Sequence, residues 1–134
     1  MAPMATPDIP IFAELTPDEL TAVTALAEEV EFPAGYPLMI EGIPATEMAV
    51  VISGSVVVRK GNETVAQLGP GEVIGEIALL SRRRRTASVV TAEDSTLWVL
   101  EADGFDQVLA DHPSVGPKVL RVVAERLADL EERS

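Results

Sequence analysis

The sequence predicts a mainly β domain with flanking helices, and three observations carry this prediction. Six short runs of strand-forming residues lie at 36–41, 47–52, 55–60, 63–68, 87–92 and 95–101. Glycine, proline or acidic turn residues separate the runs, which is typical of short strands in packed sheets. Helical periodicity precedes and follows them. A double-stranded β-helix (jelly roll), with one N-terminal helix and two C-terminal helices, satisfies this order because its paired sheets limit exposed edges.

One helix is predicted before the strands. Thr16 is placed to cap it, Pro17 suits its first position, and Glu19 completes a capping box. Apolar residues then recur at helical spacing from Leu20 to Val30, so the helix is expected to extend to about Val30.

Two helices are predicted after the strands. Asp103 can cap a short helix that stops at His112, next to Pro113, and a longer helix begins at about Val115. The longer helix carries more apolar residues than one face needs, so some of them are expected to pack on a second subunit. These residues are Val119, Leu120, Val122, Val123, Leu127 and Leu130.

The composition describes one globular domain. The chain has 134 residues, of which 47% are hydrophobic and 24% are charged. We expect a flexible lead-in at 1–10, followed by a single domain at 11–134. No apolar stretch is long enough to span a bilayer, so no membrane contact is expected. Because residues 1–10 lack the pattern of a secretory signal, we expect a cytoplasmic protein.

Charge and residue types argue against several classes of function. The net charge of −12 argues against direct nucleic-acid binding, because Lys and Arg supply most of that affinity. The chain has no cysteine and a single histidine, His112, so neither a metal nor another cofactor is expected. No Ser-His-Asp set can be placed, so no catalytic residue is assigned and no enzyme activity is expected.

The few cations are concentrated at one place. Arg82, Arg83, Arg84 and Arg85 are four of the ten Lys and Arg residues in the chain. Such a run is either a solvated loop with local ion pairs or an anion-binding site. The residues that surround it favour the anion-binding site.

The stretch before the arginines has the residues of a phosphate site. Gly75 lets the backbone approach a ligand, and the N–H groups of Ile77 and Ala78 open a helix-like run where they can bind an anion. Arg85, ten positions after Gly75, can close over the same anion with two parallel hydrogen bonds. Glu76 would repel a phosphate but suits a neutral hydroxyl beside it, such as a ribose 2′-OH. A sugar hydroxyl next to a singly charged phosphate describes a cyclic nucleotide.

The same stretch resembles a known family. The segments G-E-I-A-L-L at 75–80 and R-T-A-S-V at 85–89 resemble the phosphate-binding cassette of cyclic-nucleotide-binding domains, with the same spacing. These domains occur in catabolite activator proteins, cyclic-nucleotide-dependent kinases and nucleotide-gated channels. The resemblance covers about residues 10–130. It departs at Arg84, where many cassettes have proline, and the run of arginines leaves a one-residue slip in the phosphate pairing open.

The resemblance implies a role for each residue of a cassette at 75–88. The ligand-binding residues are expected to be Gly75, Glu76, Ile77, Ala78, Arg85, Thr86 and Ala87. The backbone of the first segment would contact ribose and phosphate. Glu76 would bind the ribose 2′-OH and Arg85 the cyclic phosphate, whereas Thr86 and Ala87 would contact the phosphate and the base edge. Arg82 to Arg84 are expected to face solvent, and Arg126, Leu127 and Leu130 are candidates for capping the base.

The predicted function is that of a regulatory sensor domain in signal transduction that holds cAMP or cGMP. Its partners would be the cyclic nucleotide and either a second copy of the chain or an effector domain or protein. The alternative is a degenerate module with an empty pocket, used for protein docking or dimerisation. In an empty cassette, Glu76 and Arg85 would form a salt bridge with each other.

Overall fold

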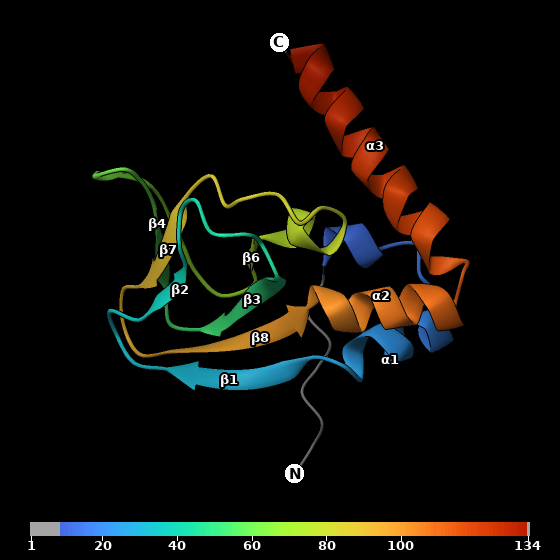
Figure 1. Ribbon diagram of the computed structural model, residues 1–134, viewed down its shortest axis with the longest axis horizontal. Helices are drawn as coiled ribbons and strands as arrows, with labels where there is room; N and C mark the ends of the chain where they lie inside the picture. The colour runs from blue at the N-terminus through green and yellow to red at the C-terminus, as the bar shows by residue number, and fades with distance from the viewer. Residues whose placement is uncertain (1–8, 134) are drawn as a thin grey trace.

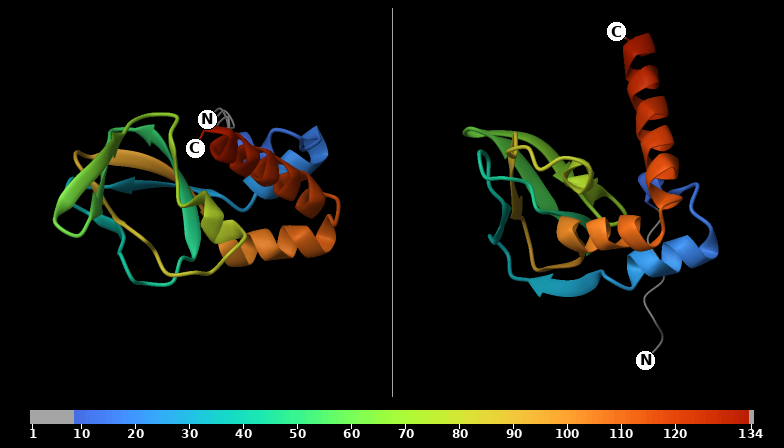
Figure 2. Two further views of the ribbon diagram at one scale, coloured as in Figure 1. Left: turned by 90° about the horizontal axis from the view of Figure 1, so that it is seen from above. Right: turned by 45° about the vertical axis from the view of Figure 1, so that its right-hand side comes forward.

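A computed structural model describes residues 9–133 as two four-stranded antiparallel sheets, with the helices gathered at one side (Figures 1 and 2). One sheet has the order β1 (Glu28–Phe32), β8 (Ser95–Glu101), β3 (Glu47–Ser53), β6 (Val73–Ile74). The other has the order β2 (Pro37–Met39), β7 (Ser88–Thr91), β4 (Val56–Lys60), β5 (Glu63–Leu68). The predicted jelly roll with flanking helices is confirmed.

Strands β3 and β8 are buried on both faces. Val51 and Leu97 point towards the second sheet, where they pack in the core between the sheets. Val50 and Trp98 point the other way, into a second core shared with the helices. Double burial explains why both strands are continuous apolar runs in the sequence rather than alternating ones.

The N-terminal part of the domain contains η1 (Pro10–Phe12) and α1 (Pro17–Thr24). The predicted capping box is confirmed: Thr16 N–H donates to the Glu19 carboxylate at 2.8 Å, and Glu19 N–H donates to Thr16 Oγ1 at 3.2 Å. Most of the predicted lead-in, residues 1–8, lies outside the described residues. Ile9 is buried in the helix-side core and Pro10 begins η1, so these two residues belong to the packed domain.

The prediction that the first helix extends to about Val30 is wrong. The helix ends at Thr24, and Glu28–Phe32 forms β1, in which Val30 lies opposite Leu97 of β8. Val30 and Phe32 are partly buried while Glu29 and Glu31, which alternate with them, are exposed, and this is the two-residue period of a strand. Residues 28–32 fit both this strand period and a helical period, and pairing with β8 selected the strand.

The chain ends in α2 (Ala102–Asp111) and α3 (Val115–Arg133). The predicted cap at Asp103 is wrong, because Asp103 is the second residue of α2 and the N-cap residue is Glu101. Strand β8 runs straight into α2 (Figure 1), and Ala102 N–H donates to the Thr46 carbonyl at 2.8 Å. The carbonyl of Thr46, just before β3, therefore satisfies one of the backbone donors that the first turn of a helix leaves without an intrahelical partner.

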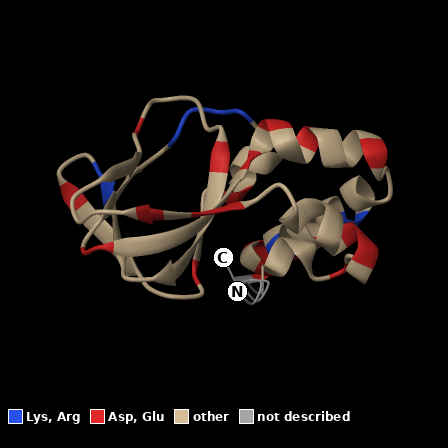
Figure 3. Cartoon of the chain, turned by 90° about the horizontal axis from the view of Figure 1, so that it is seen from below, with Lys and Arg blue, Asp and Glu red and all other residues tan. Residues whose placement is uncertain are grey.

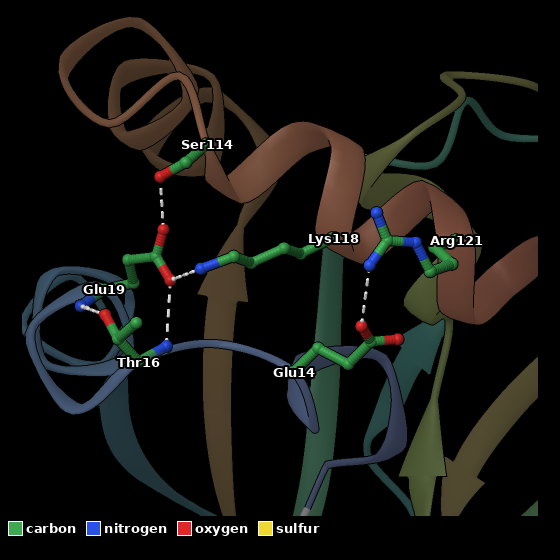
Figure 4. Close-up of polar contacts among 6 residues, drawn as sticks. All are labelled: Glu14, Thr16, Glu19, Ser114, Lys118 and Arg121. Carbon is green, nitrogen blue, oxygen red and sulfur yellow. Dashed lines mark hydrogen bonds and ion pairs between the residues drawn. The ribbon is translucent and has the colours of Figure 1, made fainter.

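A buried carboxylate, Glu19, fixes α1 to the base of α3 (Figure 4). Its Oε1 accepts hydrogen bonds from Thr16 N–H and from Lys118 Nζ at 2.5 Å, and its Oε2 accepts one from the Ser114 hydroxyl. These donors, above all Lys118, lower the pKa of Glu19 from 4.5 to about 2. The ionised form is thus built into the fold.

We expect Glu19→Gln to make the stability of the domain less sensitive to acid. The folded carboxylate stays ionised down to about pH 2, whereas the unfolded one takes up its proton near its ordinary pKa of 4.5. The stabilisation is therefore present above about pH 4.5 and is lost as the pH falls towards 2. Urea unfolding across this window should show a steeper loss for the natural protein than for Glu19→Gln. Parallel curves for the two proteins would contradict this account.

Candidate functional site

A pocket of about 960 Å³ lies beside the short helix η2 (Glu76–Leu79) and the arginine loop that follows it. All seven residues predicted from the sequence line this pocket: Gly75, Glu76, Ile77, Ala78, Arg85, Thr86 and Ala87. Sequence analysis missed the apolar wall, which consists of Met39, Ala45, Val58, Val73, Ile74 and Val89. Several of these are inward-facing strand residues, so the alternation of each strand is the signal that identifies them.

Gly75 is placed where only glycine fits well. Its φ is +71°, in the left-handed region that disfavours side chains. A Cβ on Gly75 would lie 2.5 Å from Arg85 Nη1 and 3.2 Å from the Glu47 carbonyl oxygen. The guanidinium of Arg85 therefore packs directly against the glycine backbone, which brings the two ends of the cassette together.

Arg85 is held from the start of β3. Its side chain is only 9% exposed, and its Nη2 donates to the Glu47 carbonyl at 2.6 Å and to Glu47 Oε1 at 3.4 Å. Burial lowers the pKa of Arg85 from its ordinary value, and the Glu47 carboxylate opposes that shift, so the group stays cationic. Glu47, 38 positions away in the sequence, had no motif that marked it as a partner.

Glu76 pairs with α3 rather than with Arg85. Its carboxylate accepts a hydrogen bond from Arg126 Nη1, and the Glu76 side chain is only 16% exposed. The salt bridge expected between Glu76 and Arg85 in an empty cassette is replaced by two separate pairs, Glu76 with Arg126 and Arg85 with Glu47. Arg126, one of the three candidates for capping the base, thus contacts the cassette through this ion pair.

The predicted anion donors need one correction. Ala78 N–H donates to the Gly75 carbonyl at 3.0 Å, so in this conformation it does not point freely into the pocket. The reason is that η2 is a 3₁₀ helix, in which the residue three positions after Gly75 closes the first turn. The sequence favoured a helix start with free donors but gave no sign of this tighter turn.

The arginine loop does not simply face solvent. Arg82, Arg83 and Arg84 are exposed, as predicted, but two of them have specific contacts. Arg84 Nη1 donates to the Gly42 carbonyl at 2.7 Å, and Arg82 forms ion pairs with Asp103 and Asp106 of α2. Thr86, next to Arg85, is exposed where it lines the pocket.

Among residues 9–133, no group of three or more His, Cys, Asp or Glu residues is arranged to hold a metal ion. Within the same range, no helix is long and apolar enough to cross a membrane.

Comparison with known proteins identifies the family. The sequence model of the cyclic nucleotide-binding domain matches residues 29–112, more than half of the chain. The chain therefore belongs to the cyclic nucleotide-binding domain family, and the resemblance inferred from the cassette is confirmed.

Two bacterial relatives are similar over most of this chain. It is 30% identical over 122 residues to the CRP-like cAMP-activated global transcriptional regulator of Mycobacterium tuberculosis, covering 87% of this chain and 54% of that protein. It is 33% identical over 129 residues to the cyclic AMP receptor protein of Thermus thermophilus, covering 91% and 60%. The chain thus spans somewhat more than half the length of these relatives.

Solved structures agree with this assignment. The N-terminal domain of a transcriptional regulator from Streptomyces coelicolor A3(2) superposes with a TM-score of 0.83 at 30% identity, covering 92% of both chains. The catabolite activator protein of Thermus thermophilus gives a TM-score of 0.72 at 32% identity, covering 93% of this chain and 62% of that one.

Substituting Gly75 should cost more stability than substituting a glycine with the same backbone but open surroundings. Gly61 has a φ of +63° and nothing within 4 Å of a built Cβ, so Gly61→Ala tests the backbone alone. We expect Gly61→Ala to lower the free energy of unfolding by about 1–2 kcal/mol. Gly75→Ala should lose about 1 kcal/mol more, because the added methyl displaces Arg85 from the Glu47 carbonyl. Equal losses in urea unfolding would show that the contact between Gly75 and Arg85 contributes nothing.

Proposed function

We propose that the pocket beside η2 binds a cyclic nucleotide, cAMP or cGMP, and that the domain acts as a regulatory sensor. The observation that carries the proposal is the convergence of all seven cassette residues on one pocket, with the guanidinium of Arg85 buried in its wall. A volume of about 960 Å³ is within the range of small-molecule sites. The family assignment and the relatives named as cAMP-activated or cyclic AMP receptor proteins support it.

The charge of the pocket suits a singly charged phosphate. Arg85 is bound chiefly by a neutral backbone carbonyl, while the Glu47 carboxylate lies at the longer distance of 3.4 Å. Its positive charge is therefore only partly compensated, and a cyclic phosphate could complete the compensation with a charge-assisted hydrogen bond. Arg83 and Arg84 at the same pocket add to the attraction in a chain whose net charge is −12.

Glu76 is proposed to bind the ribose, and Thr86 to contact the phosphate and the base. The Glu76 carboxylate is an acceptor at the pocket wall, which suits a ribose 2′-OH, and its present partner Arg126 would then shift or share it. The Thr86 hydroxyl lies beside the proposed phosphate position. In a syn nucleotide it could also accept a hydrogen bond from the 2-amino group that guanine has and adenine lacks.

Calorimetric titration tests the proposal. We expect the chain to bind one cAMP or cGMP with a dissociation constant on the order of micromolar, about −8 kcal/mol. Arg85→Ala should lose about 2–5 kcal/mol of binding free energy, because it removes the buried cation that pairs with the phosphate. Arg59→Ala provides the matched control, since Arg59 is exposed on β4 and is not among the lining residues.

The same titration separates the alternatives. No heat with either nucleotide at millimolar concentration would reject the sensor and leave the degenerate docking module. Equal losses in Arg85→Ala and Arg84→Ala would show that the phosphate pairing is shared along the arginine run rather than centred on Arg85.

The choice between the two nucleotides should depend on Thr86. We expect Thr86→Ala to weaken cGMP more than cAMP, by about 0.5–1.5 kcal/mol, the worth of one net hydrogen bond. Thr86→Ser keeps the hydroxyl and should retain the preference. If Thr86→Ala lowered both affinities by the same factor, the hydroxyl would be a phosphate contact with no influence on the base. We infer that both nucleotides bind and that cAMP is the natural ligand.

We propose two kinds of partner: a second copy of the chain, and an effector domain or protein. Exposed leucines on α3 support the second copy. Leu120 and Leu127, seven residues apart on α3, are 62% and 56% exposed. This spacing places them on one face, which suits packing against the same helix of a second copy. Figure 1 and the right-hand view in Figure 2 show α3 extending away from the β-sheets, where a second helix has access to it.

The output of the proposed sensor would lie in an effector domain or protein. The relatives named transcriptional regulators extend beyond the stretch that this chain matches, and a relative named acetyltransferase Pat, from Mycolicibacterium smegmatis, is covered over only 36% of its length. For this chain, the absence of enzyme activity, of a cofactor, and of direct nucleic-acid or membrane contact stay predictions. The cytoplasmic location also stays a prediction.

A further inference from the structure

The four consecutive arginines divide into two groups with different surroundings. Arg83, Arg84 and Arg85 line the pocket, whereas Arg82 is not among its lining residues. Arg82 is turned towards α2 instead. Figure 3 shows the arginine loop, in blue, running to the beginning of α2, which carries acidic residues in red.

Arg82 connects the cassette to α2 through three contacts. Its Nη2 donates to Asp106 Oδ2 at 2.7 Å and to Asp103 Oδ1 at 3.2 Å. The two aspartates are three residues apart in α2, so their carboxylates lie on the same side of the helix. Its Nη1 donates to the carbonyl of Ala78, one of the pocket-lining residues of η2, at 3.2 Å.

The junction between η2 and α2, where Arg82 makes these contacts, also has an apolar side. Ala78 and Leu79 of η2 are both 2% exposed, and Leu79 belongs to the core that contains Ala102 and Phe105 of α2. The backbone of η2 is thus held to α2 by packing on one side and by the ion pairs of Arg82 on the other. No residue of α2 lines the pocket, so both sets of contacts act on η2 from outside the pocket.

We propose that Arg82 is a positioning residue for the nucleotide site, which keeps η2 on α2 in the conformation that binds the ligand. Arg82 touches no ligand in this account. It acts through the carbonyl of Ala78, because fixing that carbonyl fixes the turn from Gly75 to Leu79 that faces the ligand. The inference rests on the proposed function, since it assigns a residue that supports the same pocket.

The pair of variants Arg82→Gln and Asp106→Asn tests this from both ends of the junction. Each should weaken cAMP and cGMP by the same factor, about three- to tenfold, because a preorganised site loses its ordering and neither base is contacted. The double variant should bind no more weakly than the weaker single one. The ratio between natural protein and variant should approach one in 1 M NaCl, since these partly exposed ion pairs are screened.

Asp111→Asn is the matched control, an exposed aspartate at the far end of α2 that accepts from Gln107 and not from the cassette. A loss in Arg82→Gln without one in Asp106→Asn or Asp103→Asn would overturn the inference, because Arg82 would then act on the ligand directly. Additive losses in the double variant would also overturn it.

A readout without nucleotide separates this inference from the proposed function. Amide hydrogen exchange at Ala78, Leu80 and Ser81, which donate within the η2 turn, should speed up in Arg82→Gln and in Asp106→Asn. If the natural protein binds neither nucleotide, the proposed function fails and this exchange alone decides the role of Arg82. Unchanged exchange in both variants would overturn it.

Discussion

The pairing of β3 with β8 is the constraint on which the rest of the structure depends. Both strands are buried on both faces, so they separate the core between the sheets from the core under the helices. Their register brings the start of β3, at Glu47, opposite the end of β8, at Glu101. The Glu47 carbonyl holds Arg85, and the residue after Glu101 begins α2, which holds Arg82. One strand pair thus anchors both ends of the arginine run.

The electrostatics of the site follow from where each cation finds a partner. An acidic chain offers many carboxylates, yet Arg85 is held mainly by a backbone oxygen and remains partly uncompensated in the pocket wall. Arg82, which is turned away from the pocket, has two aspartates. Arg85 is therefore available to an anionic ligand, whereas Arg82 stabilises the fold, although the two are only three positions apart in the sequence.

Helix α3 makes polar contacts with two parts of the structure: with α1 near its first residues, and with the cassette further along its length. Its base is fixed to α1 by the buried Glu19, which accepts from Ser114 and Lys118 (Figure 4). Further along, Arg126 reaches the cassette at Glu76. Between these points Leu120 remains exposed. The helix therefore contacts the cassette through the ion pair of Arg126 with Glu76, while the buried residues that hold it, Val115 and Val119, lie near its other end.

The sequence by itself determined the features that depend on residues close together in the chain. The capping box of Thr16 and Glu19, the run of short strands, and the spacing from Gly75 to Arg85 each follow from neighbouring residues, and the structure contains all three. It also identified the seven cassette residues that line the pocket, because the cassette is one continuous stretch, but not the apolar wall, whose residues come from separate strands.

The tertiary structure decided what depends on residues distant in sequence. Residues 28–32 had both a helical and a strand period, and only pairing with β8 selected the strand. Asp103 could cap a helix, but α2 begins one residue earlier, at Ala102, where β8 ends and the Thr46 carbonyl accepts from the Ala102 N–H. Arg85 and Glu76 are separated from their partners by 38 and 50 positions, and Arg82 is separated from its two aspartates by 21 and 24. Such pairs form because folding brings them within hydrogen-bond distance, and no local pattern in the chain specifies that distance.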